Sequence, residues 1–149
     1  MLTLSLLRHA KSSWKDVSIP DHARPLNDRG KAEAPFMGRA IAKHGLDPNL
    51  VLCSTARRTR DTLALVLPEL KSEPKIAYVD GLYHGAPAEM LNILRSEGAG
   101  ASQVLLIGHN PEIQTFALDL IGSGSKLLKS KLEAKLPTAG LVVIVVRGE

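Results

Sequence analysis

Short apolar runs alternate with segments of helical periodicity along the whole chain. Each run is brief and rich in Leu, Val or Ile, so we expect strands at residues 2–7, 49–53, 75–79, 103–107 and 141–146. The fourth run has a continuous β-branched and leucine character, which is typical of a strand covered on both faces of a sheet.

Helical patterns fill the intervals between these strands. We expect helices from about residue 28 to 44, from about 55 to 67, at 88–96 and at 113–121. In the last of these, apolar residues recur at i, i+3, i+4, i+7 and i+8, which makes one helix face apolar. The alternation of strands and helices predicts a three-layer α/β/α sandwich, with a mostly parallel central sheet and helices on both faces.

Capping residues indicate where two of the helices begin and end. Asn27 or Asp28 is a plausible N-cap of the first helix, and Gly45 is its left-handed terminator. Pro35 lies inside this span, so the helix is expected to be kinked or to start late. Ser54 or Thr55 is expected to cap the second helix, which should end before Pro68.

Composition limits the class of protein. The chain has 149 residues, 44% of them hydrophobic, which fits one domain over residues 1–149. Its formal net charge of +4 favours anionic ligands, and its single cysteine, Cys53, excludes an internal disulfide and a zinc cluster. The first apolar run is too short to span a bilayer and lacks a signal-peptide pattern, so a cytoplasmic protein is expected.

The residues that could bind a ligand or take part in a reaction follow three of the strands. Arg8 and His9 end the first run, the basic segment 54–62 follows the second, and Gly108-His109 follows the fourth. The carboxyl ends of strands in open α/β sheets are where ligands bind, and a helix N-terminus favours an anion. Two histidines and several arginines at these positions predict a site for a phosphoryl group.

These residues resemble the signatures of the histidine phosphatase superfamily. Arg8-His9-Ala10 is similar to its first motif and the match extends through Ser12 and Trp14. Ser54, Arg58 and Thr62 resemble the spacing of its second motif, and Gly108-His109 its last. Further matches are Arg24-Pro25-Leu26 and Gly30. Within the superfamily, the chain most resembles the small SixA-type phosphohistidine phosphatases, which implies a phosphoglycerate mutase-like fold.

The resemblance implies a two-step reaction without a metal or cofactor. His9 would attack phosphorus and form a phosphohistidine enzyme intermediate, which water then hydrolyses. Arg8, Arg58 and His109 would bind the phosphoryl oxygens, and the cationic pocket would replace the electrostatic role of a metal ion. The further phosphate contacts expected are Lys11, Ser12 and Arg24, although Arg24 is equally plausible as a structural ion-pair residue.

The chain also departs from the superfamily pattern. Many phosphomonoesterase members carry an acidic proton donor after the third strand, where this chain has Leu82-Tyr83-His84. His84 is either the proton donor or a hydrogen-bonded loop residue. Because an imidazole leaving group needs less protonation than an alkoxide, the missing acid favours a P–N substrate. Lys11 and Lys15 replace residues of mutase-like members, which counts against mutase activity.

These features favour a phosphatase acting on phosphohistidine in a protein. The alternatives are a phosphomonoesterase acting on a small metabolite, and a catalytically silent phosphate- or nucleic-acid-binding module. Because aromatics are few and the arginines lie in motifs, a nucleic acid is not expected as a partner. A membrane is not expected either. The lysine-rich segment 126–135 is expected to be a solvated flank, Trp14 is expected to pack its loop, and the oligomeric state stays open.

Overall fold

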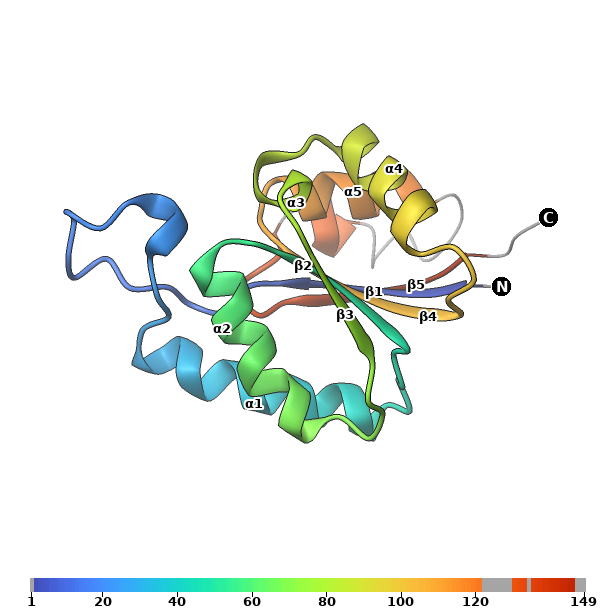
Figure 1. Cartoon of the computed structure of the whole chain (residues 1–149), viewed down its shortest axis with the longest axis horizontal. Coiled ribbons are helices and arrows are strands. Elements are labelled where there is room, and N and C mark those ends of the chain that lie inside the picture. The colour runs from blue at the N-terminus through green and yellow to red at the C-terminus, as the bar shows by residue number, and fades with distance from the viewer. Residues whose placement is uncertain (1, 122–129, 134, 147–149) are drawn as a thin grey trace.

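A mixed sheet forms the centre of the molecule in the computed structural model, which describes residues 2–121, 130–133 and 135–146 (Figure 1). Its strand order is β3-β2-β4-β1-β5. The strands are β1 (Leu2–Arg8), β2 (Leu50–Ser54), β3 (Lys75–Val79), β4 (Gln103–Gly108) and β5 (Leu141–Val146). The first four are parallel and β5 runs antiparallel to β1, which confirms the mostly parallel sheet predicted from the sequence.

Helices cover both faces of this sheet, as Figure 1 shows. One face carries α1 (Asp28–Lys43) and α2 (Arg57–Val66), which pack against each other. The other carries α3 (Gly81–His84), α4 (Pro87–Glu97) and α5 (Glu112–Leu120). Two short 3-10 turns, η1 (Asp21–Ala23) and η2 (Leu67–Glu69), complete these elements. The three-layer α/β/α architecture is therefore confirmed.

The core lies on both sides of the central strands β1 and β4. Alternate residues of each strand point to opposite faces, so Leu6 and Leu106 join one apolar cluster while Leu7 and Ile107 join the other. All four of these side chains are fully buried. A rigid centre of this kind fixes the loops that leave the carboxyl ends of β1 and β4.

Asn27 is confirmed as the N-cap of the first helix, whereas the late start expected from Pro35 and the predicted cap of the second helix are wrong. The first helix begins at Asp28 despite Pro35, because the side chain of Asn27 accepts a hydrogen bond from the Gly30 amide and caps the helix there. The second helix is capped by Ala56, without a side-chain hydrogen bond, instead of by Ser54 or Thr55. The predicted terminator of α1 is confirmed, since Gly45 has a φ of 73°.

The lysine-rich segment 126–135 lies partly outside the described residues, which include only 130–133 and 135 of it. The prediction that it is a solvated flank therefore stays a prediction. None of the helices in the described part of the chain combines the length and hydropathy needed to cross a bilayer.

Candidate active site

Three neighbouring strands deliver the candidate residues to one edge of the sheet. His9 follows β1, His109 follows β4, and Ser54 ends β2, with β4 lying between the other two strands. The rings of His9 and His109 come within 5.3 Å of each other, measured between their centroids. The structure thus brings together the two histidines that the sequence places a hundred residues apart.

The hydrogen bond of His9 determines which ring nitrogen is free to react. Its Nδ1 lies 2.7 Å from the carbonyl oxygen of Ala10. Because a carbonyl oxygen only accepts, Nδ1 carries the proton and Nε2 of the neutral ring carries the lone pair. The side chain is 7% exposed, so the ring is held in one orientation by its surroundings.

The environment of His9 keeps its imidazole neutral. Burial is the main cause that lowers the pKa of His9 to about 4, and the positive charges of Arg58, Arg8 and Arg24 lower it further. The hydrogen bond to Ala10 opposes this shift. At neutral pH the ring is therefore neutral, with an unprotonated Nε2, within a cluster of three guanidinium groups.

These guanidinium groups offer buried donors. Arg24 and Arg58 are each 6% exposed, and Arg8, half-buried, donates from Nη1 to the carbonyl oxygen of Leu136 at 2.9 Å. The Nε atoms of all three arginines are buried without a hydrogen-bond partner among the described residues. Buried donors normally have partners, and the oxygens of a bound phosphoryl group would satisfy these.

Asp21 connects two of the arginines, although sequence reasoning gave it no role in the site. One carboxylate oxygen accepts from Arg24 Nη2 at 3.2 Å, and the other accepts from Arg58 Nη2 at 3.1 Å and from the Tyr83 hydroxyl. The hydrogen bond from Tyr83 is the main cause that holds the pKa of Asp21 below its usual range. The sequence around Asp21 does not predict this role, because Arg58 and Tyr83 come from other parts of the chain.

The second motif links the loops that carry the two histidines. Ser54 Oγ lies 2.7 Å from Nε2 of His109, and Ser54 is fully buried. This contact uses the hydroxyl that the sequence assigned to helix capping. Thr62 Oγ1 accepts from the Ala10 amide at 3.0 Å and donates to the carbonyl oxygen of Arg58 at 2.7 Å. The residue after His9 is thereby tied to the helix that carries Arg58.

The other predicted contacts differ in position. Ser12 is buried and its hydroxyl accepts a hydrogen bond from Arg24, so both belong to the wall of the site. Lys11 is half-exposed; its amide donates to Glu33 Oε1 at 3.1 Å, and its side chain forms no hydrogen bond or ion pair with another described residue. His84 lies in α3, but its side chain is outside the part that the structure describes.

A metal site is not formed by the described residues. No three side chains of His, Cys, Asp or Glu gather within those ranges in a way that could hold a metal ion. The groups that converge at the sheet edge are cationic or neutral donors, together with the carboxylate of Asp21. This arrangement can bind a tetrahedral anion and present a neutral imidazole to it.

Comparison with known proteins identifies the family of the chain. The model of the histidine phosphatase superfamily (branch 1) matches residues 4–82. An uncharacterized protein of Mycobacterium tuberculosis is 33% identical over 95% of this chain and 88% of its own length. A chloroplastic protein of Arabidopsis thaliana is 35% identical over 83% of this chain and 61% of its own length.

Solved structures are similar over almost the whole chain. A protein assigned as the phosphohistidine phosphatase SixA of Agrobacterium tumefaciens has a TM-score of 0.84 and 32% identity, over 95% of this chain and 90% of that chain. The protein histidine phosphatase SixA complexed with tungstate has a TM-score of 0.81 over 97% and 88%; its 20% identity shows the fold alone. The match to the family model, which covers more than half of the chain, shows that the chain belongs to the histidine phosphatase superfamily.

Proposed function

We propose that this protein hydrolyses phosphohistidine in another protein, through a covalent intermediate on His9. Membership of the superfamily supports phosphatase activity, and the 32% identical neighbour assigned as a phosphohistidine phosphatase supports the substrate class. The observation that carries the mechanism is the buried, neutral His9 with its Nδ1 bonded to Ala10 and three arginines around it.

In the first step, Nε2 of His9 attacks phosphorus and the bond from phosphorus to the substrate nitrogen breaks. The substrate imidazole leaves as a neutral ring when its distal nitrogen carries a proton. In the second step, water attacks the phosphoryl group on His9, which releases inorganic phosphate and restores Nε2. Arg8, Arg58 and His109 would stabilise the charge that spreads over the equatorial oxygens in both steps.

The state of Asp21 favours a P–N bond over a phosphate ester. An alkoxide leaving group has to be protonated in the transition state. Asp21 is the carboxylate that contacts Arg58 and Arg24, but its lowered pKa keeps it ionised, so it holds no proton to donate. An imidazole leaving group does not depend on such a donor.

A rapid-quench experiment tests this function. Brief incubation with a labelled phosphohistidine protein should leave acid-labile, base-stable label on His9, and His9→Ala should abolish both label and turnover. His44→Ala is the matched control, because His44 lies at the end of α1 and belongs to no candidate motif. Turnover retained in His9→Ala would rule out the mechanism.

A substrate panel separates the alternatives. Assays of the same protein with sugar and aromatic phosphates would identify a phosphomonoesterase if one of them were preferred by several orders of magnitude. A phosphate- or nucleic-acid-binding module would bind without turnover. If the reaction is independent of metal, the protein should stay active in the presence of a chelator. We propose the cytoplasm as its location.

A further inference from the structure

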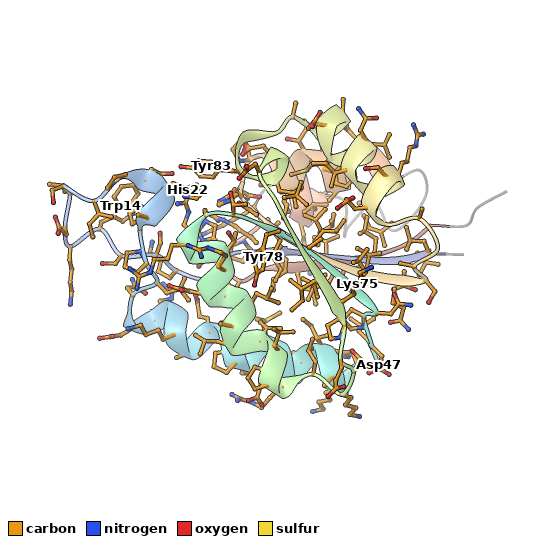
Figure 2. The ribbon with its side chains drawn as sticks, viewed as in Figure 1. Trp14, His22, Asp47, Lys75, Tyr78 and Tyr83 are labelled. Carbon is orange, nitrogen blue, oxygen red and sulfur yellow. The ribbon has the colours of Figure 1, made fainter. Side chains whose placement is uncertain are left out.

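A loop projects at the end of the molecule opposite the start of β1 and the end of β5 (Figure 1). It comprises residues 13–20, between the isolated bridge from Ser12 to Leu26 and the turn η1, and we refer to it as the arm. Figure 2 shows Trp14 on this arm, with His22 and Tyr83 near its base. The arm therefore lies where the remainder of a substrate would be when its phosphoryl group is in the site.

Hydrogen bonds hold the arm in a defined conformation. At its base, the Ser13 amide donates to the carbonyl oxygen of Pro25 at 2.8 Å. At its tip, the Asp16 carboxylate accepts from the Ser18 amide at 3.0 Å and from the Ser18 hydroxyl at 2.6 Å. A loop ordered before binding loses little conformational entropy when a partner contacts it.

The arm presents apolar groups to solvent. Trp14 is 64% exposed and Val17 is 89% exposed, and Lys15 beside them is exposed as well. Trp14 contacts Arg24 but is largely exposed, so the prediction that it packs its loop is confirmed only in part. Tryptophan is enriched at the centres of protein interfaces, where a large ring is buried by the partner.

Trp14 is also in direct contact with the cationic site. The guanidinium carbon of Arg24 lies 3.6 Å from the centre of the indole ring. Arg24 in turn donates to Asp21, which also accepts from Arg58. A surface that covers Trp14 is therefore separated from the phosphoryl-binding groups by one guanidinium group.

The burial of the site explains why such a surface is useful. His9 and Arg58 are 7% and 6% exposed, so only the phosphoryl group and the ring that carries it reach them. The body of the substrate stays outside, beside the arm. A small phosphate compound ends at the site and gains nothing from Val17, whereas a protein gains the burial of Trp14 and Val17.

We propose that the arm is the docking surface for the protein that carries the phosphohistidine, an inference that rests on the proposed function. The partner buries Trp14 and Val17 under an apolar patch next to its phosphorylated residue. It places acidic groups opposite Lys15, in keeping with the chain's net charge of +4. Lys15 is the cation of the arm, and the neighbouring Asp16 carboxylate, which accepts from Ser18, keeps its negative charge.

Two substrates with the same P–N bond test this proposal. One is a histidine-containing protein phosphorylated chemically with phosphoramidate, and the other is phosphohistidine as the free amino acid. Val17→Ser should raise KM for the protein on the order of tenfold and leave kcat/KM for the free amino acid unchanged. Trp14→Ala should raise KM for the protein at least as much, although its contact with Arg24 makes Val17→Ser the cleaner variant.

The chain offers matched controls for both substitutions. Phe36 on α1 is 62% exposed and Val145 on β5 is 52% exposed, and neither belongs to the site or the arm. Phe36→Ala and Val145→Ser should leave the kinetics with both substrates unchanged. A similar loss with the controls would attribute the effect to lost exposed apolar surface in general and overturn the proposal.

The kinetic results that would contradict the docking proposal differ from those that would contradict the proposed function. If the wild-type protein hydrolyses the phosphoprotein and the arm variants do so equally well, the docking proposal is overturned and the proposed function stands. If the arm variants lose activity equally with both substrates, the arm supports the site and is not a docking surface. If the wild-type protein hydrolyses neither substrate, the proposed function fails and the docking proposal fails with it.

Discussion

The proton of His9 resides on Nδ1, the ring nitrogen that faces the carbonyl oxygen of Ala10. The carbonyl of Ala10 fixes this tautomer, while burial and three arginines disfavour a second proton. The same positive charges that would bind a phosphoryl group therefore also keep its attacker unprotonated. In the proposed mechanism, one cluster of residues would perform both tasks without a separate base.

We expect His9 to titrate well below an ordinary histidine. Nitrogen-detected NMR of the free protein should give a midpoint near 4, against about 6.5 for the urea-unfolded chain. As the pH falls from about 6.5 towards 4, the unfolded chain gains a proton that the folded protein does not, so the free energy of unfolding decreases in this window. A midpoint at or above 6.5 in the folded protein would contradict the assigned environment.

Asp21 is expected to orient the guanidinium groups of Arg58 and Arg24. Asp21→Ala removes the acceptor shared by Arg58 and Arg24, so kcat/KM should fall on the order of a hundredfold. Asp21→Asn keeps one acceptor oxygen and should lose less. Asp47→Ala is the control, because Asp47 is exposed and lies before β2, in neither the candidate site nor the arm. Equal turnover in Asp21→Ala and the wild-type protein would show that the arginines are positioned without it.

At the scale of elements, the site depends on how closely α1 approaches the loop after β1. A Cβ atom added to Gly30 would lie 2.1 Å from the backbone oxygen of Lys11, two residues after His9. The Asn27 amide donates to that same oxygen at 3.0 Å, so the start of α1 and the loop after β1 form one unit.

Gly30→Ala should therefore move the start of α1 away from the loop after β1. Relief of the clash requires a backbone shift, so we expect a loss of about 1–3 kcal/mol in the free energy of unfolding and a clear fall in kcat. Urea denaturation and turnover of the same preparation measure both effects. Ala32→Ser, at an exposed position of the same helix, should change neither. A stable, fully active Gly30→Ala variant would show that the contact is not tight.

Elements were easier to predict than the contacts between them. The strands follow from apolar runs, and the structure places their ends within one residue of the prediction. The cap of α1 was predictable because Asn27 acts locally, within its own helix. The cap of α2 was not, because the Ser54 hydroxyl contacts His109, a residue distant in the sequence.

The same distinction applies to the site. His9 and His109 follow strand ends and Arg58 lies in the first turn of α2, all within recognisable motifs, so the sequence identifies them as candidates. Asp21 carries no such signal, because its role exists only where η1, α2 and α3 meet.

At the scale of the whole molecule, the strand order brings the chemistry together. β1 and β4 are neighbours in the middle of the sheet, and β2 lies next to β4. The loops that follow these strands therefore leave the same edge side by side. The sequence predicted a mostly parallel sheet but not this order, which depends on how the helices pack across its faces.

The antiparallel direction of β5 has a practical consequence for handling the protein. Leu2 pairs with Val146, so the first and last described residues lie together at the edge away from His9 (Figure 1). A biotin group or a fluorescent fusion attached near either of them would point away from an incoming substrate. Immobilisation on a sensor chip through this edge should leave phosphate binding as it is in solution, so that binding and release can be followed in real time.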